Sequence, residues 1–194
     1  MSERQALQDQ VATRFSRAED EATALSVLVA GLDGFRPVND SLSAELRDSI
    51  LEQFRDVVLS LAGSAYRLRE DIYAVLVPGT SAQAAISLAE QLRETVARVV
   101  LTPVGEASVS LGVASYPESV VSAAELVYGA QTAMYWAKAT GGNRVRYWGE
   151  LVPVERRGVE AQGYDERPVI TARGDSEAKD LDRRPADQPA IPVR

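Results

Sequence analysis

Residues 65–79 read AYRLREDIYAVLVPG, and this stretch decides how the middle of the chain must fold. Two short runs rich in aromatic and β-branched residues, 65–68 and 72–77, flank the polar tripeptide Arg69-Glu70-Asp71. This pattern predicts two strands joined as a β-hairpin. Pro78 and Gly79 end the second strand, because proline lacks the N–H that a sheet ladder requires.

Outward from the hairpin, helical and strand patterns alternate. Residues 25–32 are an almost unbroken apolar run of strand length, which predicts a strand buried on both faces. Asn39-Asp40-Ser41 offers the side chains of a helix N-cap. The other patterns predict helices over 7–22, 42–61, 81–99 and 122–138, and strands over 107–115 and 145–148.

The predicted order of elements is α-β-α-β-β-α-β-α-β. Its inner β-α-β-β-α-β unit is the ferredoxin-like arrangement, a sheet backed by its helices on one face. We therefore predict an α/β (α+β) fold with a ferredoxin-like core, an extra N-terminal helix and an extra edge strand. This fold serves many unrelated functions, so function has to be argued from the site.

Composition narrows the chemistry that the chain can perform. The formal net charge of −7 disfavours nucleic acid as a partner. The chain has no Cys and no His, which excludes disulfides, thiol nucleophiles, the usual zinc sites and imidazole catalysis. A metal ion would need oxygen ligands, as Mg²⁺, Mn²⁺ and Ca²⁺ prefer. The N-terminus does not resemble a signal peptide, and no apolar run reaches the ~18 residues of a membrane span. We expect a cytoplasmic protein without membrane contact.

Composition changes sharply near Gly149. Residues 150–194 hold five of the nine prolines and many charges of both signs, with little apolar periodicity. Such a segment cannot bury enough apolar surface to offset the entropy lost on ordering. We predict one folded domain over 1–149 and a disordered, charged C-terminal tail over 150–194.

Four stretches carry more specific patterns: LDGFRPVND (32–40), YRLREDIYAVLVP (66–78), VSLGVASYP (109–117) and AQTAMYWAK (130–138). In order and spacing they resemble four motifs of the bacterial GGDEF domains, or diguanylate cyclases. Those motifs are D-x-D-x-F-K-x-x-N-D, Y-R-x-G-G-D-E-F-A-V-L-L-P, V-S-I-G-V-A-x-Y-P and A-D-x-A-L-Y-x-A-K. The resemblance covers about residues 7–148, and it implies the ferredoxin-like core of the GGDEF or nucleotidyl cyclase type.

The resemblance also implies a reaction and a metal site. Active members convert two GTP molecules to cyclic di-GMP on a head-to-head dimer, with divalent cations held by carboxylates. Here the first metal carboxylate aligns with Gly31, and the G-G-D-E-F signature is replaced by Arg69-Glu70-Asp71-Ile72-Tyr73. Asp71 and, less directly, Asp33 are the candidate metal ligands that remain. Asp33 is better explained as a turn or capping residue, because a residue two positions along a strand from the lost ligand does not substitute for it directly. A lone carboxylate holds Mg²⁺ poorly. We therefore expect no catalytic residues of the family's kind, a pseudoenzyme, and Mg²⁺ or Mn²⁺ only together with a bound nucleotide.

The nucleotide-binding positions are better preserved. Asn39 and Asp48 align with residues that contact guanine, and Arg36 and Lys138 with positive charges near the phosphates. Each also has a structural explanation: Asn39 as a helix cap, Asp48 as a polar-face residue, Arg36 and Lys138 as solvated side chains. The family's inhibitory product site, R-x-x-D, aligns with residues 60–63, which read SLAG, so we expect no cyclic di-GMP binding there.

Three functions stay open from the sequence. The first is a degenerate, non-catalytic GGDEF domain that acts as a regulatory protein-interaction module in cyclic di-GMP signalling. It would form a homodimer or a heterodimer with another GGDEF-type protein, with residual GTP binding as an option. Ile72 and Tyr73 would then offer an apolar contact surface, unless Tyr73 packs in the core. The second is an active diguanylate cyclase with altered metal ligation through Asp33 and Asp71. The third is a structural or assembly domain that binds no nucleotide.

Overall fold

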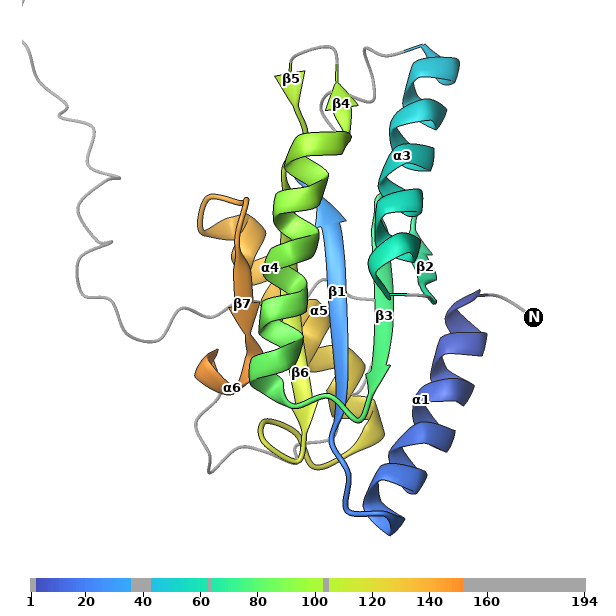
Figure 1. Cartoon of the computed structure of the whole chain (residues 1–194), viewed down its shortest axis with the longest axis vertical. Helices are drawn as coiled ribbons and strands as arrows, with labels where there is room; N and C mark the ends of the chain where they lie inside the picture. Colours follow the sequence, from blue (N-terminus) through green and yellow to red (C-terminus); the bar gives the residue numbers. More distant parts are fainter. Residues whose placement is uncertain (1–2, 36–42, 63, 103–104, 152–194) are drawn as a thin grey trace, which may run out of the picture.

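The computed structural model describes residues 3–35, 43–62, 64–102 and 105–151, which form a five-stranded sheet with helices on both faces (Figure 1). The elements follow in this order: α1 Glu3–Asp20, β1 Leu25–Leu32, α3 Ala44–Ala62, β2 Tyr66–Arg69, β3 Ile72–Pro78, α4 Ala82–Val99, β4 Leu101–Thr102, β5 Gly105–Glu106, β6 Val109–Tyr116, α5 Ala123–Ala139, β7 Val145–Tyr147 and α6 Trp148–Leu151.

Strand β1 lies at the centre of the sheet, whose order is β2-β3-β1-β6-β7. It pairs antiparallel with β3 on one side and with β6 on the other, and all eight of its residues are buried. The sequence predicted this strand with its bounds, because only a central strand needs an apolar side chain at nearly every position. β7 lies at the edge of the sheet, as predicted, where it pairs parallel with β6.

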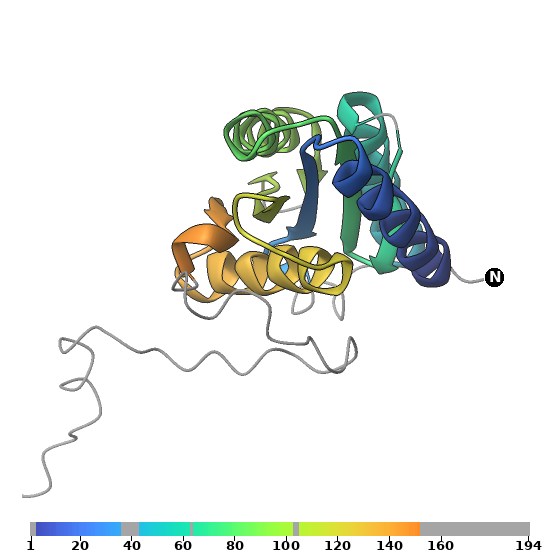
Figure 2. The same ribbon diagram turned by 90° about the horizontal axis from the view of Figure 1, so that it is seen from below.

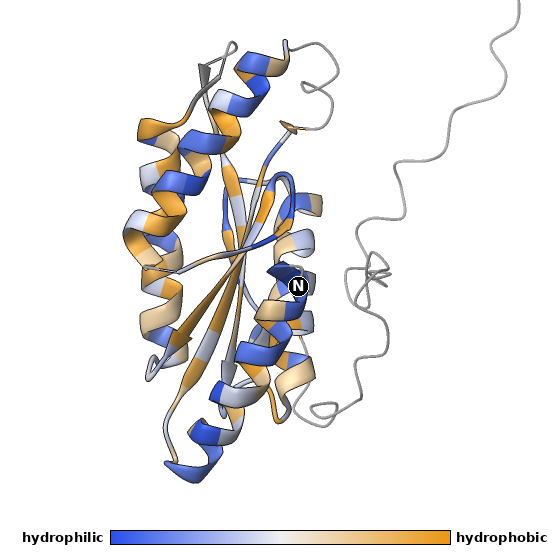
Figure 3. Ribbon diagram, turned by 90° about the vertical axis from the view of Figure 1, so that its right-hand side faces the viewer, coloured by the Kyte–Doolittle hydropathy of each residue, from blue (hydrophilic) through white to orange (hydrophobic). Residues whose placement is uncertain are grey.

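Two apolar cores lie on the two faces of the sheet. Helices α3 and α4 cover one face, while α1 and α5 cover the other (Figures 1 and 2). Alternate residues of β1 serve the two cores: Leu28, Ala30 and Leu32 face α3 and α4, whereas Val27 and Val29 face α1 and α5. In Figure 3 the strands are mostly hydrophobic in colour, and the helices alternate between polar and apolar segments. The α/β fold with a ferredoxin-like core is confirmed, and α1 and α5 complete it on the second face.

The first residues of the helices can be compared with the N-cap residues predicted from the sequence. The hydroxyl oxygens of Ser81 and Ser122 accept backbone N–H groups at the starts of α4 and α5, as predicted. The start of α3 differs: the Ser43 hydroxyl accepts from the Leu46 N–H at 3.3 Å, so this helix begins beyond the predicted cap. The cap residues 39–41 lie outside the described residues.

Three further differences concern short elements. Trp148, predicted as the end of the last strand, begins α6 and packs edge-on against Tyr128, with ring centroids 6.0 Å apart. The two-residue strands β4 and β5 pair antiparallel and had no sequence signal. The structure describes nothing beyond residue 151, so the predicted tail stays a prediction. Within the described ranges, no helix is both long and apolar enough to span a membrane.

The hairpin of β2 and β3 presents no apolar contact surface at Ile72 and Tyr73. Ile72 is 2% exposed and packs in the core beneath α1 and α5. Tyr73 is 4% exposed and meets Phe54 edge-on, with ring centroids 5.5 Å apart. Burial raises the pKa of the Tyr73 phenol above its usual value. The predicted contact surface was therefore wrong and the alternative, packing of Tyr73 in the core, is confirmed, because helices cover the hairpin strand on both faces.

Candidate functional site

The carboxyl end of β1 is where the predicted metal ligands meet. Its last residue, Leu32, donates its backbone N–H to the carbonyl of Asp71, in the turn of the hairpin, at 3.1 Å. The next residue, Asp33, donates its backbone N–H to the carbonyl of Ser108, just before β6, at 2.9 Å. These two backbone bonds bring Asp33 and Asp71 to one end of the sheet.

The Asp33 carboxylate is held by donors of the protein itself. One oxygen accepts from the Ser110 hydroxyl at 2.7 Å, and the other from the Ser108 hydroxyl at 3.0 Å and from the Asn143 backbone N–H at 2.8 Å. The backbone of Gly142 lies so near that a Cβ there would be 3.0 Å from this second oxygen. Asp33 therefore ties the end of β1 to the start of β6 and to the turn after α5.

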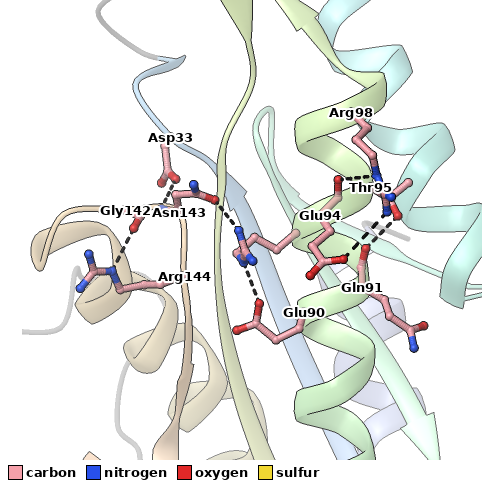
Figure 4. Close-up of polar contacts among 10 residues, drawn as sticks. Asp33, Glu90, Gln91, Glu94, Thr95, Arg98, Gly142, Asn143 and Arg144 are labelled. Atoms are coloured by element: carbon pink, nitrogen blue, oxygen red, sulfur yellow. Dashed lines mark hydrogen bonds and ion pairs between the residues drawn. The ribbon is translucent and has the colours of Figure 1, made fainter.

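The same network continues from Asn143 to helix α4 (Figure 4). Asn143 has a φ of 48°, a left-handed conformation that asparagine tolerates better than most residues. Its side-chain oxygen accepts from Arg93 at 3.1 Å, and Arg93 forms an ion pair with Glu90 at 2.7 Å. The sequence analysis did not single out Ser108, Ser110 or Arg93. The two serines are spaced two residues apart, just before and within β6, and this spacing could have placed both on the face of Asp33. Arg93 had no comparable signal in the sequence.

Lys138 reaches the same end of β1 from the last turn of α5. Its ammonium donates a hydrogen bond to the backbone carbonyl of Leu32 and lies 3.7 Å from a carboxylate oxygen of Asp71. Asp71 is only 6% exposed, so its charge is largely removed from water. Gly31 gives the lysine room: a Cβ at this position would lie 2.9 Å from Lys138 Cε and 3.1 Å from its Nζ.

These residues do not fit a divalent cation. No group of three or more acidic side chains that could hold a metal gathers anywhere in the described ranges. At the end of β1, the Asp71 carboxylate faces the ammonium of Lys138, and the Asp33 carboxylate accepts three hydrogen bonds. Mg²⁺ needs near-octahedral oxygen ligation, and a fixed positive charge opposes its approach.

Of the other predicted nucleotide contacts, Asp48 lies within the described residues and does not join this cluster. Asp48 lies on α3 with its side chain 63% exposed, and it pairs with its neighbour Arg47 at 3.3 Å. Asn39 and Arg36 lie outside the described residues. The structure thus brings together Asp33, Asp71 and Lys138, of the six predicted positions.

The hairpin that stands in place of the glycine-rich signature turns without left-handed residues. Arg69 and Glu70 both keep negative φ angles. A register shift between Arg67 and Arg69 accommodates the turn instead, with Arg67 opposite Tyr73 and Arg69 opposite Ile72. Side chains therefore stand where glycines would leave the backbone open to a ligand.

Comparison with known proteins identifies the family of this chain. The family model described as "Diguanylate cyclase, GGDEF domain" matches residues 1–144. The chain belongs to the GGDEF family. This GGDEF domain is 32% identical over 145 residues to Diguanylate cyclase A of Treponema denticola, an alignment that covers 72% of this chain and 39% of the relative. The chain thus spans about two fifths of that relative's length.

Solved structures confirm the fold of the GGDEF domain. The active GGEEF domain of a diguanylate cyclase from Vibrio cholerae superposes with a TM-score of 0.68 at 22% identity, covering 74% of this chain and 95% of that one. The diguanylate cyclase SiaD of Pseudomonas aeruginosa, solved in complex with its activator SiaC, gives a TM-score of 0.66 at 20% identity, covering 74% and 57%. At these identities the likeness concerns the fold.

Proposed function

We propose that this GGDEF domain is a non-catalytic, regulatory protein-interaction module of cyclic di-GMP signalling. The observation that carries the proposal is the ammonium of Lys138, which lies against Asp71 and the Leu32 carbonyl, next to a glycine at position 31. Two-metal phosphoryl transfer needs carboxylates that are free to bind cations. In this site one carboxylate faces a lysine and the other accepts three hydrogen bonds from the protein.

Residual GTP binding is compatible with the same geometry. Guanine recognition would fall to Asn39 and Asp48, and the Asp48 side chain is exposed to solvent. A phosphate contact from Lys138 would require its ammonium to turn away from the Leu32 carbonyl. Mg²⁺ or Mn²⁺ would then arrive only with the nucleotide, held mostly by its phosphates.

One protein of the same fold is known in complex with a regulatory protein, which supports a role through protein contacts. SiaD, which contains a domain of this fold, was solved in complex with its activator SiaC. For this chain we propose a homodimer, or a heterodimer with another GGDEF-type protein, in the cytoplasm. The partner would meet a domain whose core is intact and whose reaction site is closed by its own side chains.

The product assay tests the loss of catalysis. The full chain, incubated with GTP and either Mg²⁺ or Mn²⁺, is expected to form cyclic di-GMP at least about 10³-fold more slowly than the active Vibrio cholerae domain assayed in parallel, since losing one preorganised charge-stabilising group alone costs about 10²–10³ in rate. Chromatography of the reaction products provides the measurement. Product formed at a rate comparable to the reference, and abolished by Asp71→Asn, would instead support an active cyclase with altered metal ligation.

Calorimetric titration with GTP separates the two non-catalytic functions. Binding that Asp48→Ala and Asn39→Ala each weaken would support a nucleotide-responsive regulator. The matched control is Asp56→Ala, because Asp56 is an exposed acid on the same helix, paired with its neighbour Arg55 at 3.1 Å. The absence of heat with GTP would favour the assembly domain that binds no nucleotide.

A further inference from the structure

The end of β1 forms a small cradle of oxygen atoms, which we call the β1 cradle: the backbone carbonyl of Leu32 and the carboxylate of Asp71. Carbonyl and carboxylate oxygens are the ligands that bind hard cations in proteins. The two are brought together by the backbone hydrogen bond from Leu32 to Asp71. The sheet and its hairpin therefore place the Leu32 carbonyl and residue Asp71 side by side.

The positive charge in this cradle is the ammonium group of Lys138. The Lys138 ammonium donates to the Leu32 carbonyl and lies 3.7 Å from Asp71 Oδ2. The lysine side chain is 24% exposed and the aspartate side chain 9% exposed, so this pair is mostly shielded from water. A buried carboxylate is costly unless a partner compensates its charge. Lys138 supplies that compensation.

Gly31 explains why the lysine fits. A Cβ on Gly31 would lie 2.9 Å from Lys138 Cε, 3.1 Å from its Nζ and 3.2 Å from Met134 Sδ. Met134 and Lys138 are four residues apart on α5, so they lie on one face of the helix. Any side chain at position 31 would compete with the lysine stem for this space. The Lys138 side chain therefore has room in this position because residue 31 carries no side chain.

We infer that the Lys138 ammonium is a built-in replacement for a divalent cation in the β1 cradle, and that it closes the cradle to metal ions. The cradle lies in the same site as the proposed function. Only the link between the closed cradle and the loss of cyclase activity rests on that proposed function. An ammonium at this place satisfies Asp71 and repels a second cation. Removal of the ammonium should leave the two oxygen ligands open to Mn²⁺.

The test is a Mn²⁺ titration of the full chain followed by electron paramagnetic resonance. We compare the wild-type chain with Lys138→Met, which keeps an unbranched apolar stem, and with Lys138→Met/Asp71→Asn. Arg98→Met is the matched control for net charge, because the Arg98 side chain is 72% exposed at the end of α4. We expect Lys138→Met to bind one Mn²⁺ at least about tenfold more tightly than the wild type or Arg98→Met, and the double variant to lose this gain.

Two outcomes would overturn the inference. One is equal Mn²⁺ affinity in Lys138→Met and Arg98→Met. The other is tight, Asp71-dependent Mn²⁺ binding by the wild-type chain. Circular dichroism shows whether each variant folds, and Lys138→Gln replaces Lys138→Met if the latter does not.

Gly31→Asp/Lys138→Met adds a second carboxylate in the space that the lysine leaves, and it should bind Mn²⁺ more tightly still. No nucleotide is present, so a failure here leaves the product assay to decide the proposed function separately.

Discussion

Gly112→Ala is expected to lower the free energy of unfolding by about 3 kcal/mol or more, the largest effect of any single substitution considered for this domain. A Cβ on Gly112 would lie 2.0 Å from the Ala130 carbonyl oxygen and 2.3 Å from the Met134 backbone nitrogen. Both are backbone atoms of α5, which cannot rotate away as a side chain would. The whole helix would have to lift from β6 and open the core beneath it. Urea denaturation followed by circular dichroism measures the loss.

Gly31→Ala is the matched control for this substitution. It also adds one methyl group to a glycine in a central strand, but the nearest atoms belong to the flexible end of Lys138 and to the Met134 side chain. These can shift, so we expect a smaller loss, about 1 kcal/mol. Equal losses for the two variants would show that α5 does not lie as close to β6 as the structure places it.

Asp33→Ala is expected to cost about 2–3 kcal/mol of unfolding free energy and, when combined with Lys138→Met, to leave the Mn²⁺ affinity of that variant unchanged. The carboxylate accepts three hydrogen bonds, from Ser108, Ser110 and the Asn143 backbone, and hydrogen bonds to a charged acceptor are the stronger kind. Its loss would release the start of β6 and the turn after α5 together. Thermal melting of Asp33→Ala measures the first effect, and Mn²⁺ titration of Lys138→Met with and without Asp33→Ala measures the second.

Asp48→Ala provides the comparison for Asp33→Ala. Asp48 also carries a carboxylate at a predicted site position, but its ion pair with Arg47 is exposed, and such pairs contribute little to stability. We expect a change within about 0.5 kcal/mol. If Asp33→Ala weakened Mn²⁺ binding by Lys138→Met and left stability unchanged, Asp33 would be a metal ligand and the structural role argued for it would be wrong.

Much of the fold could be predicted from local patterns. The apolar run of β1 and the Ser81 and Ser122 caps were visible because each depends on residues adjacent in the chain. The start of α3 was misplaced because several polar residues precede it and any of them could cap a helix. Ile72 was assigned to the surface because a hairpin can be open on one face, and only the packing of α1 and α5 covers it.

The site was harder to predict because its contacts join distant parts of the chain. Lys138 lies 106 residues from Leu32 in sequence, and nothing near the lysine indicates that its ammonium turns toward a backbone carbonyl. The family resemblance placed Lys138 beside a phosphate and made Asp33 an indirect candidate metal ligand, with a turn or capping role as the favoured alternative. Gly31 was recognised as a lost ligand, but the space that it opens for a lysine depends on how α5 lies across β1.

The central claim is that the chain's own ammonium fills the β1 cradle, and ¹⁵N nuclear magnetic resonance of lysine side chains tests it most directly. Lys138 and Lys179 are the two lysines of the chain, so Lys138→Arg assigns both signals. We predict that the Lys138 ammonium protons exchange with water at least about tenfold more slowly than those of free N-acetyl-lysine, and that Asp71→Asn shifts its signal. A Lys138 signal that exchanges like the free amino acid and ignores Asp71→Asn would contradict the account.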